Sequence, residues 1–151
     1  LNPETNDFWF AEIGQGATLN DKPMSLSPVP PLMEARLLSS SGMLHRGNSP
    51  KIPKTQFHFH NSIAFRMVLV AQGRYDATIS VQPKCDWDIA AAELIVDEAG
   101  YEVSTPDGQD FLYNQEDVRH TGIVVAGPGL HQEILVRLEG IELTKDRKPG
   151  S

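Results

Sequence analysis

Apolar residues recur at helical spacing in two segments of the chain. Between residues 87 and 99, leucine, isoleucine and alanine repeat at that spacing, and a run of alanines favours a helix. Gly100 follows, where a left-handed C-cap belongs. In the second segment, Asn61 and Ser62 supply an N-cap for a helix that stops at Gly73. The pattern therefore predicts two helices, each preceded by polar or acidic residues.

Strand patterns lie around these helices. Short apolar or alternating runs bounded by glycine, proline and asparagine predict strands at 8–13, 37–41, 56–60, 75–81 and 122–126. A small hairpin is expected from 102–104 and 111–113 around a P-D-G turn. A last helix is expected at 128–138, with Pro128 in its first turn. Strands that alternate with helices predict an α/β layered domain.

Composition narrows the classes of function. The chain has 151 residues, of which 40% are hydrophobic and 22% are charged, as in one globular domain. Its net charge of −7 leaves no basic stripe that could neutralise many phosphates, so we expect no nucleic acid polymer as a partner. The single cysteine, Cys85, cannot form an internal disulfide, and no apolar run is long enough to span a membrane. We therefore expect a cytoplasmic protein with no membrane partner.

The candidate chemistry lies at the start of the second predicted helix. Asp86 and Asp88 flank Trp87 there, and either carboxylate can cap the exposed N–H groups of the helix. Asp88 can be interpreted as a helix cap or as a metal ligand, and both roles stay open. Trp87 is expected to pack rather than to take part in chemistry, and Cys85 is expected to be structural.

Several segments of the chain resemble the inositol monophosphatase superfamily. Residues 86–100 read DWDIAAAELIVDEAG, close to the family's C-terminal motif W-D-x-A-A-x-x-x-I-x-x-E-A-G-G. Residues 61–80 read NSIAFRMVLVAQGRYDATIS, similar to the family segment G-S/T-x-A-x-x-x-x-x-V-A-x-G-x-x-D. A weaker similarity covers 37–41, LLSSS, which resembles a family strand ending in G-S. The resemblance implies that residues 1–140 form the C-terminal half of the family's fold, a layered α/β/α domain with a mixed central sheet, followed by a frayed tail at 141–151.

The resemblance also implies an activity, that of a Mg²⁺-dependent phosphomonoesterase acting on a small phosphate ester. Metal ions would clamp the phosphate and activate a water molecule, and Asp88 would be both a metal ligand and a catalytic residue. The helix N-terminus at Asn61, Ser62 and Ile63 would hold phosphate oxygens, mainly through backbone N–H groups. Simple capping of that helix is the alternative.

Three further residues match positions of the family. Ser40 matches the family serine that reaches substrate hydroxyls, although serines are also common in loops after strands. Lys84 could pair with a second phosphate or be solvated. Asp76 also matches a family position, and a role at the surface or at the start of a strand fits it equally.

Most of the family's metal ligands have no counterpart in this chain. The family carries them upstream, in a glutamate pair and a D-P-I/L-D-G-T motif, whereas the P-D-G at 106–108 is ordinary turn chemistry. The chain starts at Leu1, without Met, in a segment that resembles the middle of such a protein. We therefore expect a fragment that lacks the N-terminal metal-binding domain, has that domain as a partner and is nearly inactive alone. A homodimer is left open.

Departures from the family pattern bear on the substrate. Ser80 stands where inositol-specific members have a glutamate, Asn61 replaces a glycine, and Tyr101 replaces the second glycine of E-A-G-G. The substrate is therefore either a 3'(2'),5'-bisphosphate nucleotide or an inositol or sugar monophosphate, and both stay open. The order and residues of the motifs look closest to those of bacterial bisphosphate nucleotidases. A non-catalytic phosphate-binding module and an enzyme split between two chains are the alternatives.

Three histidines are not assigned to chemistry. His58 and His60 point to the same face of a predicted strand, but two ligands make no closed metal site. His131, on the last predicted helix, is expected at the surface.

Overall fold

A mixed five-stranded sheet forms the centre of the fold in the computed structural model, which describes residues 1–39, 57–143 and 145. The strands lie in the order β5-β4-β6-β10-β8. They are β4 (Leu37–Ser39), β5 (Phe57–Phe59), β6 (Ala77–Ser80), β8 (Glu102–Ser104) and β10 (Ile123–Ala126). β4 is parallel to β5 and β6, whereas β10 is antiparallel to β6 and β8. The mixed central sheet is therefore confirmed.

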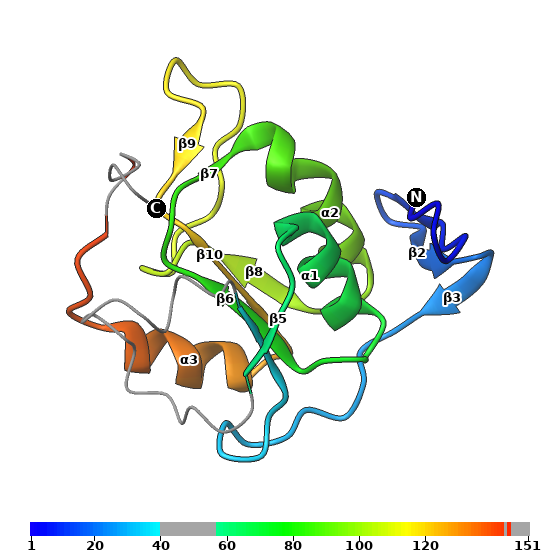
Figure 1. The fold of residues 1–151 in the computed structure, drawn as a ribbon, viewed down its shortest axis with the longest axis horizontal. Helices are drawn as coiled ribbons and strands as arrows, with labels where there is room; N and C mark the ends of the chain where they lie inside the picture. The colour runs from blue at the N-terminus through cyan, green and yellow to red at the C-terminus, as the bar shows by residue number, and fades with distance from the viewer. Residues whose placement is uncertain (40–56, 144, 146–151) are drawn as a thin grey trace.

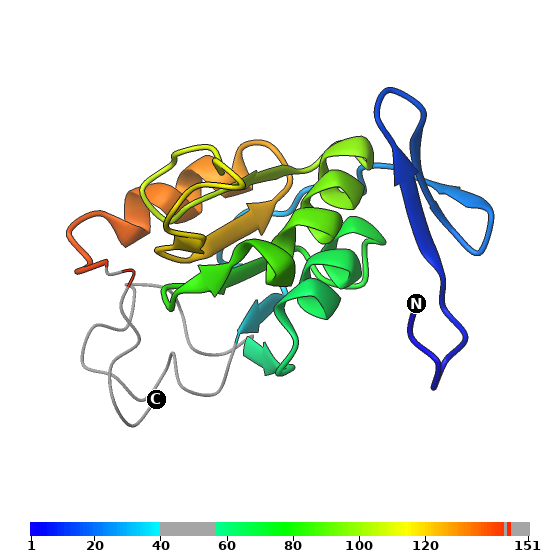
Figure 2. The same cartoon turned by 90° about the horizontal axis from the view of Figure 1, so that it is seen from above.

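Helices cover both faces of this sheet, as Figure 1 and Figure 2 show. α1 (Ile63–Ala71) and α2 (Asp86–Glu98) lie on one face, and α3 (Leu130–Leu138) lies on the other. β10 is buried on both sides, because its successive residues alternate between the cluster with α1 and α2 and the cluster with α3. The α/β/α layering is therefore confirmed. None of the helices in the described residues has the length and apolar character needed to cross a bilayer.

A second, three-stranded sheet packs against α1 and α2 near their C-terminal ends. It consists of β1 (Trp9–Glu12), β2 (Gly16–Leu19) and β3 (Lys22–Met24), which are antiparallel neighbours. The indole N–H of Trp9 donates to Oε1 of Gln72, the C-cap of α1, at 3.0 Å. The sequence predicted a strand at the position of β1, and this sheet adds a layer beyond the predicted ones.

The carboxylate of Glu98 joins this small sheet to the end of α2. Its Oε1 accepts the N–H of Gly14 at 2.7 Å, and its Oε2 accepts the N–H of Gly16 at 2.8 Å. Both glycines have positive φ, 73° and 83°, so the turn between β1 and β2 favours residues without a side chain. The glutamate of the D-E-A-G segment therefore has a structural role.

The predicted hairpin that joins 102–104 to 111–113 is wrong. β8 pairs with β10 instead, and residues 111–113 form no strand. Phe111 is buried in the cluster with α1 and α2, so this segment packs on the helix layer rather than extending the sheet. The turn in between is confirmed, because Gly108 N donates to Thr105 O at 2.9 Å.

The start of α3 also differs from the sequence prediction. The helix begins at Leu130 rather than at Pro128, because Gly129 has a φ of 85° and cannot belong to the helix. His131, expected at the surface, is only 6% exposed, and its Nε2 lies 3.0 Å from Ser104 Oγ. The ring is buried because the first turn of α3 packs on the sheet.

Glu98→Gln should lower the free energy of unfolding by about 1–3 kcal/mol, because the amide nitrogen that replaces one carboxylate oxygen cannot accept a glycine N–H. Urea denaturation measures the change. Glu12→Gln, at an exposed position of β1, is the matched control and should change stability by less than about 0.5 kcal/mol. Equal stability of Glu98→Gln and the unchanged chain would contradict the structural role of Glu98.

Candidate functional site

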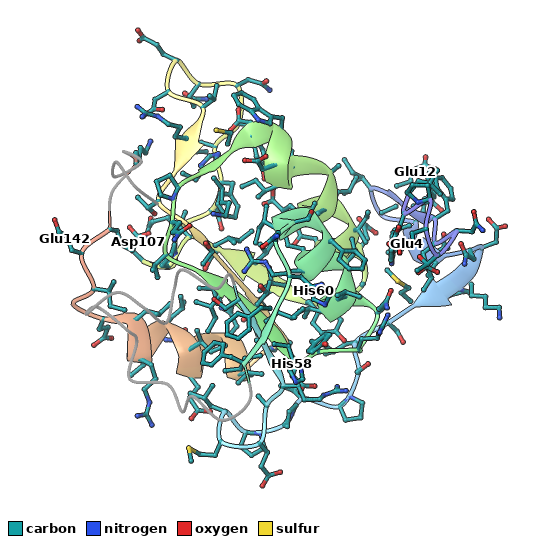
Figure 3. All side chains as sticks on the ribbon, viewed as in Figure 1. Glu4, Glu12, His58, His60, Asp107 and Glu142 are labelled. Carbon is teal, nitrogen blue, oxygen red and sulfur yellow. The ribbon has the colours of Figure 1, made fainter. Side chains whose placement is uncertain are left out.

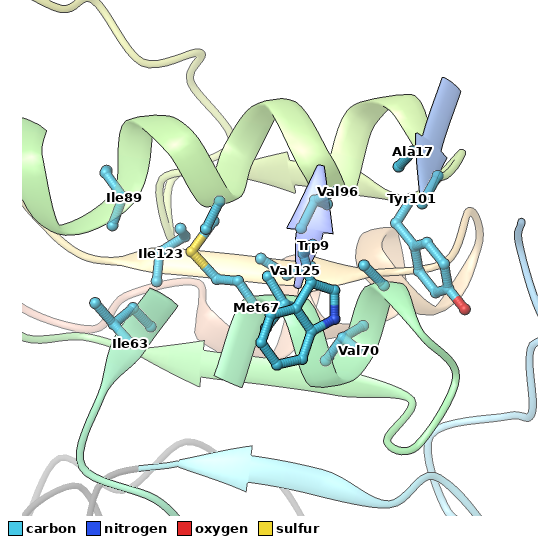
Figure 4. Packing of buried hydrophobic residues seen from close by; sticks show 14 of the residues in the cluster. Trp9, Ala17, Ile63, Met67, Val70, Ile89, Val96, Tyr101, Ile123 and Val125 are labelled. Atoms are coloured by element: carbon cyan, nitrogen blue, oxygen red, sulfur yellow. The ribbon is translucent and has the colours of Figure 1, made fainter. Parts of the chain in front are cut away.

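α1 and α2 start at the same edge of the central sheet. Ile63 at the start of α1, Ile89 in the first turn of α2 and Ile123 lie at one end of their shared cluster (Figure 4). Ile123 pairs with Ser80, the last residue of β6, so this edge is at the carboxyl end of β6. Ligands of α/β sheets commonly bind at the carboxyl ends of strands, next to helix N-termini. The structure therefore brings the two predicted site segments together.

The start of α1 has backbone N–H groups that the helix itself leaves without an acceptor. Ser62 is the N-cap, and its Oγ accepts the N–H of Phe65 at 3.2 Å. The N–H groups of Ile63 and Ala64 belong to the first turn, which has no acceptor within the helix. No acidic side chain lies in this turn to offset the positive end of the helix dipole. Capping by Ser62 is confirmed, and phosphate binding by Asn61, Ser62 and Ile63 stays a prediction.

Asp88 caps the start of α2. Its Oδ2 accepts the N–H of Cys85 at 3.1 Å, and its side chain is exposed. Burial, with a smaller effect of the Asp88 carboxylate, raises the pKa of the Cys85 thiol and keeps it protonated, which fits its structural interpretation. The capping interpretation of Asp88 is therefore confirmed, and metal binding by Asp88 stays a prediction.

The described residues hold only a part of a metal site. Within 1–39, 57–143 and 145, no group of three or more His, Cys, Asp or Glu side chains could hold a metal ion. Mg²⁺ binds about six oxygen ligands, several of them from water, and an exposed carboxylate can be one of these ligands. Asp88 fits as one ligand, and the other protein ligands would have to come from outside the described residues.

Trp87 does not pack inside the described part of the chain. It is 74% exposed, whereas Ile89 is 1% exposed. Residues two positions apart in a helix lie about 200° apart around its axis, so one of these side chains faces outward when the other enters the core. The prediction that Trp87 packs is therefore wrong for the described residues.

The carboxylate of Asp86 connects the start of α2, through hydrogen bonds, to a segment that is distant along the chain. Its Oδ2 accepts the N–H of Asn114 at 2.9 Å, and its Oδ1 lies 2.7 Å from Nε2 of His120. These contacts lower the pKa of Asp86, with the Asn114 N–H as the main cause and His120 as a smaller one. His120 belongs to β9 (Arg119–His120), which pairs antiparallel with β7 (Lys84–Cys85). Sequence reasoning missed this ribbon because its strands are short and distant along the chain.

The remaining candidates for substrate binding are Lys84 and Ser40, and Ser80 bears on the choice of substrate. Lys84 lies in β7, and its ammonium donates to the carbonyl oxygens of Gln82 and Pro83, both at 3.1 Å. Ser80 is buried at the end of β6, and its Oγ accepts the N–H of Gln82 at 3.4 Å. Ser40 lies outside the described residues. Contacts of Lys84 and Ser40 with a substrate stay predictions.

His58 and His60 pack against aromatic rings. The ring centroid of His58 lies 5.2 Å from that of Tyr75, and the ring centroid of His60 lies 5.4 Å from that of Phe65, both edge-on. Phe65 belongs to α1, so His60 lies beside that helix (Figure 3). These contacts account for both side chains without a ligand.

Sequence reasoning missed the roles of two arginines. The Arg36 guanidinium donates to both carboxylate oxygens of Asp76, at 2.9 and 3.0 Å, and joins the starts of β4 and β6. Asp76 therefore has a role at the start of a strand, one of its two interpretations. Arg66, on α1, is buried, and two of its nitrogens have no hydrogen-bond partner in the part of the chain that the structure describes. The sequence signal for Arg66 was a single charge inside the apolar run of α1.

Comparison with known proteins gives a clear family match. The model of the inositol monophosphatase family matches residues 1–141. A protein of Methanothermobacter thermautotrophicus, named fructose-1,6-bisphosphatase/inositol-1-monophosphatase, is 34% identical over 146 residues, which cover 93% of this chain and 51% of the relative. The inositol-1-monophosphatase of Caulobacter vibrioides is 28% identical over 147 residues, which cover 91% of this chain and 56% of the relative. The chain thus spans about half the length of these relatives.

Solved structures share the fold. Staphylococcal IMPase-II with bound inositol monophosphate superimposes with a TM-score of 0.75 at 21% identity, over 88% of this chain and 52% of the other. An IMPase of Thermotoga maritima gives a TM-score of 0.75 at 23% identity, over 92% of this chain and 54% of the other. The predicted fold class is therefore confirmed.

The lowered pKa of Asp86 predicts a pH-dependent contribution to stability. A carboxylate with a lower pKa in the folded state stabilises the fold above its unfolded pKa of about 3.9, and the contribution is lost as the pH falls through the folded pKa. The stability difference between the unchanged chain and Asp86→Asn should therefore be larger near about pH 7 than near about pH 3. Urea unfolding at both pH values measures it. An equal difference at both would contradict this role of Asp86.

Proposed function

This chain belongs to the inositol monophosphatase family, and on that premise we propose that it forms the C-terminal half of a Mg²⁺-dependent phosphomonoesterase. The observation that carries the proposal is the meeting of two helix N-termini at one edge of the sheet. One presents N–H groups that the helix itself leaves without an acceptor, with no acidic side chain in its first turn, and the other presents Asp86 and Asp88. Such a pair suits a phosphate group beside a divalent cation.

Different residues of this chain would bind the phosphate and the cation. The backbone N–H groups at Ile63 and its neighbours would orient oxygens of the ester phosphate, while Ser62 holds that turn in place. Asp88 would offer one carboxylate oxygen to a cation while the other accepts the N–H of Cys85. Asp86 keeps the start of α2 in position through its loop contacts. Mg²⁺, when bound, would supply the charge that stabilises the phosphate and activates water.

The rest of the site is proposed to lie in another part of the protein. The chain spans about half the length of the curated relatives, and no complete metal site occurs among the described residues. The other ligands would come from an N-terminal domain, or from a second chain that completes the enzyme. The protein is proposed to act in the cytoplasm.

The proposed substrate is a small phosphorylated metabolite, either a 3'(2'),5'-bisphosphate nucleotide or an inositol or sugar monophosphate. The name of the Methanothermobacter relative supports sugar and inositol phosphates. Ser80, which stands in place of the glutamate of inositol-specific members, favours another substrate. Lys84 would contact a second charged group of the substrate, and Ser40 would contact a hydroxyl.

A phosphate-binding module without hydrolysis is the second candidate. The capping contact of Asp88 favours it, because that contact accounts for the carboxylate without a metal ion. A relative from Neisseria meningitidis, 29% identical, also carries a name that is not that of an enzyme, putative Nus factor SuhB. Turnover decides between the two candidates.

Asp88→Asn separates metal binding from helix capping. Asparagine keeps a side-chain oxygen that can accept the N–H of Cys85, so stability should fall by only about 0.3–1 kcal/mol, from the lost negative charge at the helix N-terminus, whereas a neutral amide binds Mg²⁺ poorly. In the complete protein we expect Mg²⁺-dependent phosphate release, with kcat/KM lower by about a hundredfold or more in Asp88→Asn. Asp107→Asn, an exposed carboxylate of the P-D-G turn, is the matched control and should keep the activity.

Phosphate release is measured with bisphosphate nucleotides, inositol phosphates and sugar phosphates, by this chain alone and by the complete protein. We expect no turnover by this chain alone. Robust Mg²⁺-dependent turnover by the chain alone would contradict the division of the site between two halves. Full activity of Asp88→Asn would contradict the role of Asp88, and phosphate binding without any turnover would favour the binding module.

A further inference from the structure

A cleft lies between the P-D-G turn at 106–108 and the C-terminal half of α3. Its volume is about 390 Å³, within the range of about 300–1,000 Å³ that is usual for ligand pockets. α3 covers the face of the sheet opposite α1 and α2 (Figure 2), so the cleft is separate from the edge where those two helices start. The proposed phosphatase site therefore does not account for it.

The lining of the cleft is mainly apolar. Val136 is 52% exposed, so apolar surface continues from the cleft onto the outer face of α3. Apolar surface that is exposed in this way commonly marks an interaction site. A small molecule is normally enclosed by its pocket, whereas a peptide can lie across an open cleft and insert single side chains. The apolar residues of the lining are Pro106, Leu135, Val136, Leu138, Ile141 and Leu143.

The charges at the cleft are negative. Asp107 and Glu139 are the charged side chains among the described residues that line it, and both are exposed. The C-terminal end of α3 adds the negative end of a helix dipole and carbonyl oxygens that have no donor within the helix. One of these oxygens, Leu138 O, accepts the N–H of Ile141 at 3.1 Å. The cleft therefore favours a cation that is attached to an apolar group.

Hydrogen bonds within the P-D-G turn fix one wall of the cleft. Thr105 N donates to Gln109 O, and Gly108 N donates to Thr105 O, both at 2.9 Å. A Cβ on Gly108 would lie 3.3 Å from Cδ1 of Leu135, so the turn packs closely on α3. Because this wall is already ordered, binding needs little rearrangement of the protein.

We propose that this cleft is a docking site for a short peptide segment of a partner protein, one that carries apolar and basic side chains. An apolar side chain would enter between Pro106 and Leu135, and a Lys or Arg side chain would reach Asp107, Glu139 or the carbonyl oxygens at the end of α3. Charge complementarity selects this occupant, because an acidic segment would bring like charges together in the cleft. The inference does not depend on the proposed function.

Fluorescence anisotropy with three labelled peptides tests the docking site. The probe peptide contains leucine and arginine. One control peptide has serine in place of each leucine, and the other has glutamate in place of each arginine. The salt concentration is about 0.15 M, which screens the general attraction between a chain of net charge −7 and a basic peptide beyond about 8 Å. We expect the probe to bind and both control peptides to bind at least about tenfold more weakly.

Two variants locate the bound peptide. Glu139→Lys reverses one charge of the cleft and should weaken probe binding by about fivefold or more, while a lysine at the C-terminal end of a helix is favourable for folding. Glu12→Lys is the matched control, and Figure 3 shows Glu12 on the opposite side of the molecule from Asp107. Val136→Ser removes exposed apolar surface and should also weaken binding by about fivefold. Leu112→Ser, at a position that is 70% exposed, is its control and should keep binding.

Three results would overturn the proposal. In the first, the serine-containing peptide binds as well as the probe, or Glu139→Lys and Val136→Ser both keep probe binding, so that the peptide does not use the cleft. In the second, the probe does not bind; self-association that Val136→Ser abolishes in sedimentation equilibrium would then identify a second copy of the chain as the occupant. In the third, the probe binds only to a chain that ends at Lys145, so that the tail with Arg147 and Lys148 is the occupant.

Discussion

The parallel packing of α1 against α2 is the interaction on which the rest of the arrangement depends. Both helices bury one face on the central sheet, and their shared cluster includes Met67, Val70 and Val96. Their C-terminal ends are held by the three-stranded sheet, through Gln72 and Glu98. Because the helices run in the same direction, this packing places both N-termini at the opposite edge of the sheet. Burial of apolar side chains thus determines where the polar groups of the candidate site meet.

The two helix N-termini differ in charge although their backbones are alike. A helix dipole alone would make both ends attract anions. α2 begins with Asp86 and Asp88, whereas α1 has no acid in its first turn and carries Arg66 in its second. The acids reverse the preference at α2, so that one end favours a cation and its neighbour favours an anion. A phosphate ester bound together with a divalent cation satisfies both ends, which a ligand of one charge sign cannot do.

Signals that act within a few residues predicted most of the fold. Ser62 as a cap, the alanine-rich run of α2 and the buried strands were readable, because capping and periodicity are local. The hairpin at 111–113 was not, because the choice of β8 between two neighbours depends on the order of the whole sheet. In the site, the two helix starts were predictable by motif, whereas the contact of Asp86 with His120 and the isolation of Arg66 arise only after folding.

Backbone amide NMR tests most directly whether the two helix starts form one site. Inorganic phosphate is added first without and then with Mg²⁺, and the amide shifts of both helices are followed. The account predicts that Ile63 and Ala64 shift with phosphate alone, and that Asp86 to Asp88 join them when Mg²⁺ is present. The C-terminal ends of both helices should not respond. Shifts confined to segments away from both helix starts would contradict the account.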